Sequence, residues 1–162
     1  MGLLLVTPAY SGHNKTPWDH TESNSSKRFK VLDDYDNAAV LDKETGLVWE
    51  QSPDTNTRTW FNALSHCYTR LVGGRKGWRL PTIEELASLV DPTQVSPALP
   101  AGHPFTNVVE VSFWSATTLA DNPSRAWLQI LVFGFLTDDF KTISDSYRVW
   151  CVRGGQGIDG VQ

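Results

Sequence analysis

The ten residues from Gly77 to Leu86 (Gly-Trp-Arg-Leu-Pro-Thr-Ile-Glu-Glu-Leu) constrain the fold more than any other part of this sequence. A short apolar run passes through a proline into a helix whose start is signalled by the sequence. The side chain of Thr82 can cap this helix and Glu85 can reach back to it, which is the capping-box pattern. The apolar face predicted for the helix comprises Ile83, Leu86, Leu89 and Val90. We expect Trp78 to be buried with that face, and the other elements to pack around this corner.

Composition limits both the size of the fold and its partners. The chain has 162 residues, enough for one domain with a hydrophobic core, and it carries seven tryptophans. Its net charge is −4, and no run of Lys and Arg exceeds a few residues. A nucleic-acid partner or an anionic membrane surface is therefore not expected. No apolar run is long enough to span a bilayer.

The two cysteines, Cys67 and Cys151, lie far apart in the sequence. They can be two buried thiols, because free cysteine is commonly buried. They can equally form one disulfide, which would indicate an oxidising compartment. Closing so long a loop would stabilise the fold by roughly 4–5 kcal/mol in the chain-entropy model.

The first half of the chain is predicted to contain an arm, three strands and a helix. Residues 1–28 are rich in Ser, Thr, Asn, Gly and Pro and are interpreted as a flexible N-terminal arm. Short strands are expected at 29–32, 38–41 and 47–49, the last two joined as a hairpin. Thr59 can cap a helix that runs to about Leu71 before Gly73-Gly74.

Acidic residues and histidines do not form a convincing metal or catalytic site. Counting from Asp34, the EF-hand positions that need glycine and glutamate hold Ala39 and Thr45, so we expect a solvated acidic turn and no metal. His66 is expected on the surface of its helix, with no serine or aspartate placed by the sequence to work with it. We expect no cofactor and no enzymatic activity.

The last third of the chain is rich in strands. Strands are expected at 113–117, 126–132 and 147–152, with Gly134 at a turn between the second strand and its return. The fold class predicted is α+β, with two helices and a mostly antiparallel, strongly twisted sheet. The domain is expected to span residues 29–155, followed by a C-terminal tail at 156–162.

Five motifs in fixed order resemble the Lcl C-terminal domain family. They are Thr-Gly-Leu-Val-Trp at 45–49, Trp-Arg-Leu-Pro-Thr-Ile-Glu-Glu-Leu at 78–86, Phe-Trp-Ser-Ala-Thr-Thr at 113–118, Ala-Trp at 126–127 and Cys-Val-Arg-Gly-Gly at 151–155. The resemblance covers about residues 29–155. This family is similar to the C-type lectin-like fold, which also contains the formylglycine-generating enzymes and the target proteins of diversity-generating retroelements. One departure is Trp150, where family members often have arginine.

The resemblance carries three implications. It implies a disulfide between Cys67 and Cys151, and hence an extracellular, cell-surface or periplasmic location. It also implies a binding module, because the collagen-like protein that gives the family its name is a bacterial surface adhesin that binds sulfated polysaccharide. The calcium–sugar motifs of animal C-type lectins are absent from this sequence.

The segment Leu128–Phe135 is unusually apolar and allows two interpretations. In the first, Trp127, Gln129 and Leu131 face inward, so that Leu128 and its alternate neighbours face solvent as a patch for a partner. In the second, the register is shifted by one residue and the run is buried on both faces. The sequence leaves both interpretations open.

The composition of this region also suggests a diversified variable region. Retroelement diversification acts mostly on AAC-like codons, which cannot become Lys, Gln, Glu, Met or Trp codons. Between Leu128 and Arg148 only Gln129 and Lys141 belong to that excluded set, and both would be scaffold positions. We expect this stretch to be the variable region if the gene is diversified at all.

These observations favour a non-catalytic module that displays a variable, largely apolar surface to a protein or peptide ligand. Alternatives are an adhesin domain that binds polysaccharide, an oligomerisation domain that forms a homo-oligomer, and an oxidase of the formylglycine-generating type. That oxidase chemistry uses a copper-binding pair of reactive cysteines, which a disulfide would remove. The predicted ligand-binding residues are Phe113, Leu128, Ile130, Val132, Phe133, Phe135, Thr137, Asp139, Ser144, Ser146 and Arg148.

Overall fold

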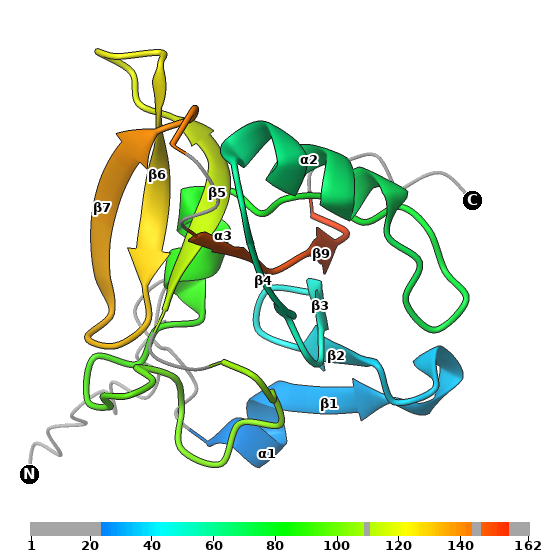
Figure 1. Ribbon diagram of the computed structural model, residues 1–162. Coiled ribbons are helices and arrows are strands. Elements are labelled where there is room, and N and C mark those ends of the chain that lie inside the picture. The colour runs from blue at the N-terminus through cyan, green and yellow to red at the C-terminus, as the bar shows by residue number, and fades with distance from the viewer. Residues whose placement is uncertain (1–23, 109–110, 144–146, 156–162) are drawn as a thin grey trace, which may run out of the picture.

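The computed structural model describes residues 24–108, 111–143 and 147–155 as an α+β arrangement with two mostly antiparallel sheets (Figure 1). The helices are α1 (Ser25–Arg28), η2 (Asp33–Tyr35), α2 (Trp60–Thr69) and α3 (Ile83–Ser88). The strands are β1 (Phe29–Leu32), β2 (Ala39–Asp42), β3 (Val48–Glu50), β4 (Asp54–Arg58), β5 (Ser112–Thr118), β6 (Arg125–Ile130), β7 (Phe135–Phe140), β8 (Tyr147–Val149) and β9 (Val152–Arg153). The predicted α+β class is confirmed.

The strands form a four-stranded sheet in the order β1-β2-β3-β9 and a five-stranded sheet in the order β4-β8-β5-β6-β7. All pairings are antiparallel except the one between β5 and β8. The single strand predicted at 147–152 is in fact two strands, because the chain passes from one sheet to the other there. This crossing places Trp150 and Cys151 between the two sheets, where both are fully buried.

The capping box predicted at Thr82 is present. The backbone N–H of Glu85 donates to Thr82 Oγ1 at 3.3 Å, and the N–H of Thr82 donates to Glu85 Oε2 at 2.9 Å. Arg79 holds the same carboxylate through two bonds, of 2.7 and 2.6 Å, and also donates to the carbonyl of Gly154. The corner that leads into α3 is therefore tied to the end of the domain.

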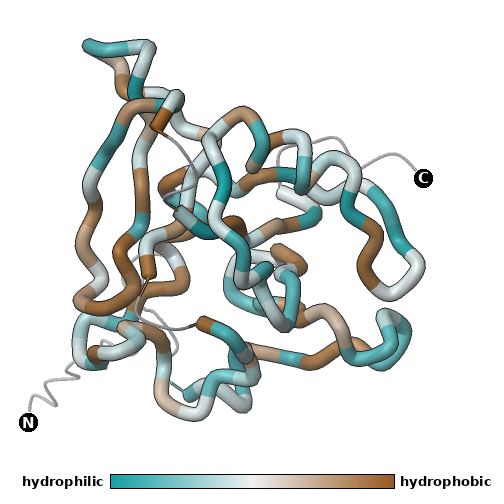
Figure 2. Tube along the Cα trace, in the orientation of Figure 1, coloured by the Kyte–Doolittle hydropathy of each residue, from teal (hydrophilic) through white to brown (hydrophobic). Residues whose placement is uncertain are grey.

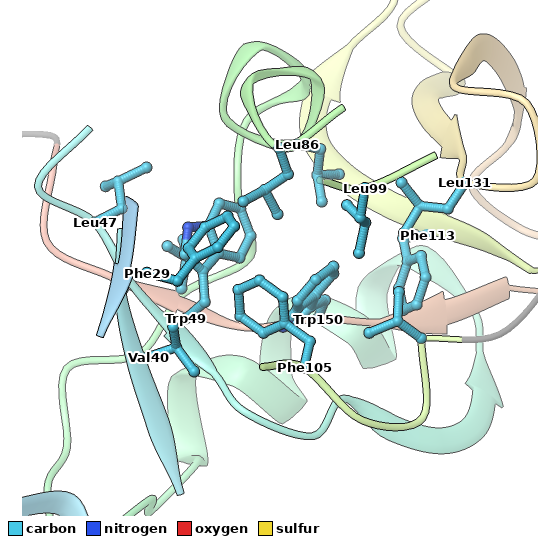
Figure 3. Close-up of a cluster of buried hydrophobic side chains, with 13 residues drawn as sticks. Phe29, Val40, Leu47, Trp49, Leu86, Leu99, Phe105, Phe113, Leu131 and Trp150 are labelled. Carbon is cyan, nitrogen blue, oxygen red and sulfur yellow. The ribbon is translucent and has the colours of Figure 1, made fainter. Parts of the chain in front are cut away.

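Two apolar clusters fill the interior. One gathers aromatic residues from many segments, and Figure 3 shows Phe105 and Phe113 close to Trp150, with centroid distances of 4.9 and 5.5 Å. The second lies around Cys67 and includes Trp114, Leu128 and Val149. Because neighbouring residues of β5, Phe113 and Trp114, belong to different clusters, the five-stranded sheet is buried on both faces at its centre.

The disulfide implied by the family resemblance joins Cys67 of α2 to Cys151, across 84 residues of sequence. Neither cysteine is free. Since disulfides persist in oxidising compartments, the bond is consistent with a location outside the cytoplasm.

Three expectations about local structure are corrected. Residues 24–28 do not belong to an arm, because Arg28 at the end of α1 is buried and binds Asp42 through two side-chain bonds. Helix α2 ends at Thr69, four residues before the glycine pair that was expected to end it. Strand β4, which has only polar residues, was not predicted. Residues 1–23 and 156–162, expected to be an arm and a tail, lie outside the described residues.

Candidate functional site

The candidate site is the hairpin formed by β6 and β7 at the margin of the five-stranded sheet. β7 is the last strand in the sheet order and pairs only with β6 (Figure 1). Four large apolar side chains are exposed on this hairpin: Phe133 (58%), Phe135 (65%), Leu136 (47%) and Phe140 (47%). We call these four residues the hairpin patch; Phe135 lies on one face of β7, and Leu136 and Phe140 lie on the other. Figure 2 shows hydrophobic residues gathered at the turn end of the hairpin.

The turn that carries the patch is fixed by the segment that follows α3. The backbone N–H of Ser96 donates to the carbonyl of Val132 at 2.9 Å, and that of Ala98 donates to the carbonyl of Leu131 at 2.7 Å. Gly134 has φ of +75°, and a Cβ at this position would approach Val90 Cγ1 to 2.7 Å. A side chain there would be excluded both by the backbone conformation and by this contact. The turn therefore presents its aromatic residues from a defined backbone.

A buried glutamine supports the same turn from within the sheet. Gln129 is fully buried, and its Nε2 donates to the carbonyls of Phe135 at 3.1 Å and Ile130 at 3.3 Å. Its Oε1 is buried with no hydrogen-bond partner among the described residues. The rings of Phe133 and Phe135 lie 6.0 Å apart at an interplanar angle of 37°. These rings thus extend from a turn whose backbone is held by hydrogen bonds.

Polar residues border the patch along β7. Arg125 bonds the Asp138 carboxylate and places its guanidinium 4.7 Å from the centroid of the Phe140 ring. The Tyr147 hydroxyl donates to Asp139 Oδ2 at 2.7 Å. Burial, together with this bond to a carboxylate, raises the pKa of Tyr147 to about 12. The border thus combines an arginine-paired carboxylate at Asp138 with a tyrosine-bonded one at Asp139.

The structure places the predicted binding residues in three environments. Phe133 and Phe135 are exposed, whereas Ile130, Val132, Thr137, Asp139 and Arg148 are partly buried. Arg148 Nη1 donates to the carbonyl of Asn107 at 3.4 Å. Ser144 and Ser146 lie outside the described residues. Their part in binding stays a prediction.

Two predicted site residues are in the wrong place for a surface. Phe113 and Leu128 are both fully buried, Phe113 against Trp150 and Leu128 in the cluster around the disulfide. Gln129 and Leu131 are also fully buried. The first interpretation of this segment, with Leu128 facing solvent, is therefore wrong at its centre. The second is right that the run is buried on both faces there, because Leu128 packs in the cluster around the disulfide and Leu131 packs in the other cluster.

The sequence interpretation missed Leu136 and Phe140, which complete the patch. The available signal was the three large apolar residues that flank a polar centre in Phe-Leu-Thr-Asp-Asp-Phe at 135–140. That pattern does not distinguish an inner strand from an edge strand. Val95, 66% exposed and next to the Ser96–Val132 bond, was also missed because it lies in a loop without periodicity.

A second, polar feature lies beside the four-stranded sheet. A depression of about 480 Å³ is lined by polar side chains that include Gln51, Asp54, Arg70 and Asn107. Glu50 lies at its base, where it bonds Arg70 and accepts from the backbone N–H of Cys151 at 2.9 Å. Burial raises the pKa of Glu50 in spite of these two bonds.

His66 lies near this depression and not in a catalytic arrangement. Its Nε2 is 3.5 Å from Asp54 Oδ2, and burial, followed by the charges of Arg58 and Arg70, lowers its pKa. The histidine is partly buried, so the expectation of a surface position is only partly met.

Three further facts concern the length of the helices and the similarity of the chain to known proteins. Within residues 24–108, 111–143 and 147–155, no helix is long and apolar enough to cross a membrane. No curated protein matches the chain. Residues 38–153 match the family described as Lcl C-terminal domain, which includes the corner at 78–86, both cysteines and the whole β6–β7 hairpin. With most of its length inside that match, the chain belongs to the Lcl C-terminal domain family.

Proposed function

We propose that this domain is a non-catalytic binding module and that the hairpin patch is the centre of its ligand site. One observation carries the proposal: the exposed rings of Phe133 and Phe135 lie 6.0 Å apart at a turn fixed by hydrogen bonds, and Leu136 and Phe140 are exposed on the other face of β7. Exposed apolar clusters on folded domains commonly mark partner sites. An aromatic centre with a charged border is the composition of a protein interface.

A protein or peptide ligand fits this surface better than a glycan does. The patch offers aromatic and aliphatic side chains, and its border carries charges that are already engaged within the domain, such as Asp138 with Arg125. Glycan sites need several free hydrogen-bonding groups around an exposed ring. The patch holds phenylalanine and leucine only, which cannot donate hydrogen bonds.

The polar depression favours polysaccharide as a second candidate ligand. Arg70, Gln51 and Asn107 offer hydrogen-bond donors within one hollow, and Arg70 Nε already binds the carboxylate at its base. Such a hollow suits hydroxyl or sulfate groups. In this candidate function, the domain serves as an adhesin through a surface separate from the hairpin.

Both proposals place the protein outside the cytoplasm, at the cell surface or in the periplasm. The disulfide supports this location. It also argues against an oxidase of the formylglycine-generating type, since both cysteines are bonded to each other. We propose on this ground that the domain is not an enzyme. A free-thiol titration of unfolded, unreduced protein should find no reactive thiol, and two reactive thiols would reopen the enzymatic alternative.

Retroelement diversification of the hairpin is a finer proposal within the same function. Gln129 and Lys141, whose side chains such diversification cannot produce, are 0% and 9% exposed. The exposed phenylalanines of the patch belong to the classes that it can produce. A template repeat beside the gene, identical except at adenines, is the expected finding, and its absence would refute the proposal.

The binding proposal is tested by a ligand screen with two double variants. Phe133→Ser/Phe135→Ser removes the two aromatic rings of the turn, and Phe61→Ser/Tyr68→Ser removes two rings of α2 that are at least 58% exposed, as a matched control. A displayed library of random twelve-residue peptides and a glycan array are probed with all three proteins. We expect peptide binding to be lost only in the first variant. Equal binding by all three proteins would refute the proposed site.

A further inference from the structure

The hydrogen bonds at the end of β7 reveal which of its backbone groups point away from the sheet. The N–H of Lys141 donates to the carbonyl of Ser124 at 2.9 Å, so Lys141 faces β6. The N–H of Phe140 donates instead to the side chain of Asp139 at 2.7 Å. Since the direction alternates along an antiparallel strand, Phe135, Thr137 and Asp139 bond to β6. Leu136, Asp138 and Phe140 therefore direct their backbone groups outward.

The outer edge of β7 is closed at one end. The carbonyl of Phe140 accepts from the N–H of Ile143 at 3.0 Å, and its N–H is held by Asp139. The carbonyl of Asp138 accepts from Arg125 Nη2 at 3.0 Å. These contacts protect the edge in the way natural sheets usually do, by occupying its free groups.

The other end of the same edge is open. Within the described parts of the chain, no hydrogen bond is formed by the outward N–H and carbonyl of Leu136 or by the N–H of Asp138. This end adjoins the hairpin patch. Phe135 and Leu136, whose side chains leave the strand on opposite faces, are 65% and 47% exposed. A strand added here would find three backbone partners and an apolar side chain on each face.

The charge of the strand indicates which occupant fits. Asp138 is neutralised by Arg125, but no lysine or arginine among the described residues lies within ion-pair distance of Asp139. The chain as a whole carries a net charge of −4. An incoming strand that places a basic side chain beside Asp139 therefore gains an opposite-charge cross-strand pair.

A second copy of the chain fits less well. Pairing two β7 strands through their outward groups in the two registers that overlap five residues sets Asp138 opposite Asp138, or Leu136 opposite Asp138. The first arrangement opposes like charges and the second sets a carboxylate against the apolar side chain. A heterologous strand has neither conflict.

We infer that the open half of the β7 edge binds an extended peptide segment of a partner protein as an added strand, with apolar residues beside Phe135 and Leu136 and a basic residue beside Asp139. This inference rests on the proposed function and specifies its mode of recognition. Main-chain bonds would supply affinity, and the alternate side chains would supply specificity.

The test uses random twelve-residue peptides displayed on phage, selected on the intact protein and then synthesised with a fluorescent label. Leu136→Pro removes the outward N–H without touching the β6 ladder, and Leu136→Val is its matched control because it keeps that N–H. We expect Leu136→Pro to weaken binding at least tenfold in fluorescence anisotropy, and Leu136→Val to weaken it less than threefold. We also expect Asp139→Asn to weaken binding of peptides with a basic residue at low salt.

Modified peptides keep the test decisive if Leu136→Pro fails to fold. Methylation of alternate peptide nitrogens is expected to abolish binding when the methylated nitrogens are those that face β7. Methylation of the intervening nitrogens should leave binding intact. Equal binding of both methylated forms, or of both Leu136 variants, would overturn strand addition. If Phe133→Ser/Phe135→Ser still weakens such binding, the proposed site stands while this mode fails. Selection of no peptide, or a dimer that Leu136→Pro disrupts in sedimentation, would also overturn the inference.

Discussion

β6 and β7 pair residue by residue, yet their apolar side chains have opposite environments. Leu128 of β6 is fully buried, whereas Leu136, Phe135 and Phe140 of β7 are about half exposed or more. Packing on the faces of the sheet explains this contrast: Leu128 lies in the buried cluster around Cys67, whereas neither buried cluster of the described residues includes Phe135, Leu136 or Phe140. Packing in the core therefore does not account for the three large apolar residues of β7.

The largest expected effect concerns the interior cluster that Leu128 shares with the disulfide. Replacing both Cys67 and Cys151 by alanine should lower the free energy of unfolding by roughly 4–5 kcal/mol, because the bond closes a loop of about 84 residues in the unfolded chain. Urea unfolding followed by tryptophan fluorescence measures this change. A loss below about 1 kcal/mol would show that the bond adds little to the core around β6.

One leucine from each strand should respond differently to truncation. Leu128→Ala should destabilise the domain by about 2–5 kcal/mol, as expected for truncation of a buried leucine. Leu136→Ala should change stability by less than about 0.5 kcal/mol, since it removes a half-exposed side chain at an edge. Thermal and urea unfolding of the two variants under one set of conditions measures both. Equal losses would contradict the contrast between the strands.

A smaller effect should appear in the pH dependence of stability. Burial raises the folded-state pKa of Glu50, so the folded protein binds a proton at Glu50 more tightly than the unfolded chain does. As pH falls from 7 toward 4.5, the free energy of unfolding of the wild type should therefore rise relative to that of Glu50→Gln. Unfolding of both proteins across this range measures the difference, and a difference that is constant with pH would contradict the raised pKa.

The smallest expected effect on stability is that of the turn aromatics. Phe133→Ser/Phe135→Ser should leave the free energy of unfolding within about 1 kcal/mol of the wild type, because both rings are mostly exposed. Retention on a hydrophobic-interaction column should fall clearly. A large loss of stability would mean that these rings stabilise the fold and are not available only for binding.

Much of the scaffold follows from local chemistry in the sequence. The capping box is encoded by Thr82 and Glu85, which are close in sequence. The hairpin turn at Gly134 is marked by a glycine between apolar runs. The pairing of Cys67 with Cys151 followed from the family resemblance, and the structure confirms it. These features depend on contacts close in sequence or on a recognised pattern.

The site could be predicted only in part, because burial on β6 and β7 depends on which distant residues pack on the faces of the sheet. Leu128 and Leu136 both lie in apolar runs, but only Leu128 is covered by a cluster of residues distant in sequence, which includes Cys67 and Val149. Parallel pairing of β5 with β8 brings residues 113 and 148 together, a contact that no local pattern encodes. For the same reason Phe113 was expected at the surface and is instead in the core.

Hydroxyl-radical footprinting, with and without a peptide selected on this protein, directly tests whether the β6–β7 hairpin is the ligand site. In the free protein we predict strong oxidation of Phe133, Phe135 and Phe140, and little oxidation of Phe113 and Leu128. When peptide saturates the protein, Phe133 and Phe135 should be protected. Phe61 and Tyr68 on α2 should remain equally reactive in both states. Unchanged oxidation of Phe133 and Phe135 in the saturated protein would contradict the assignment of the ligand site to the β6–β7 hairpin.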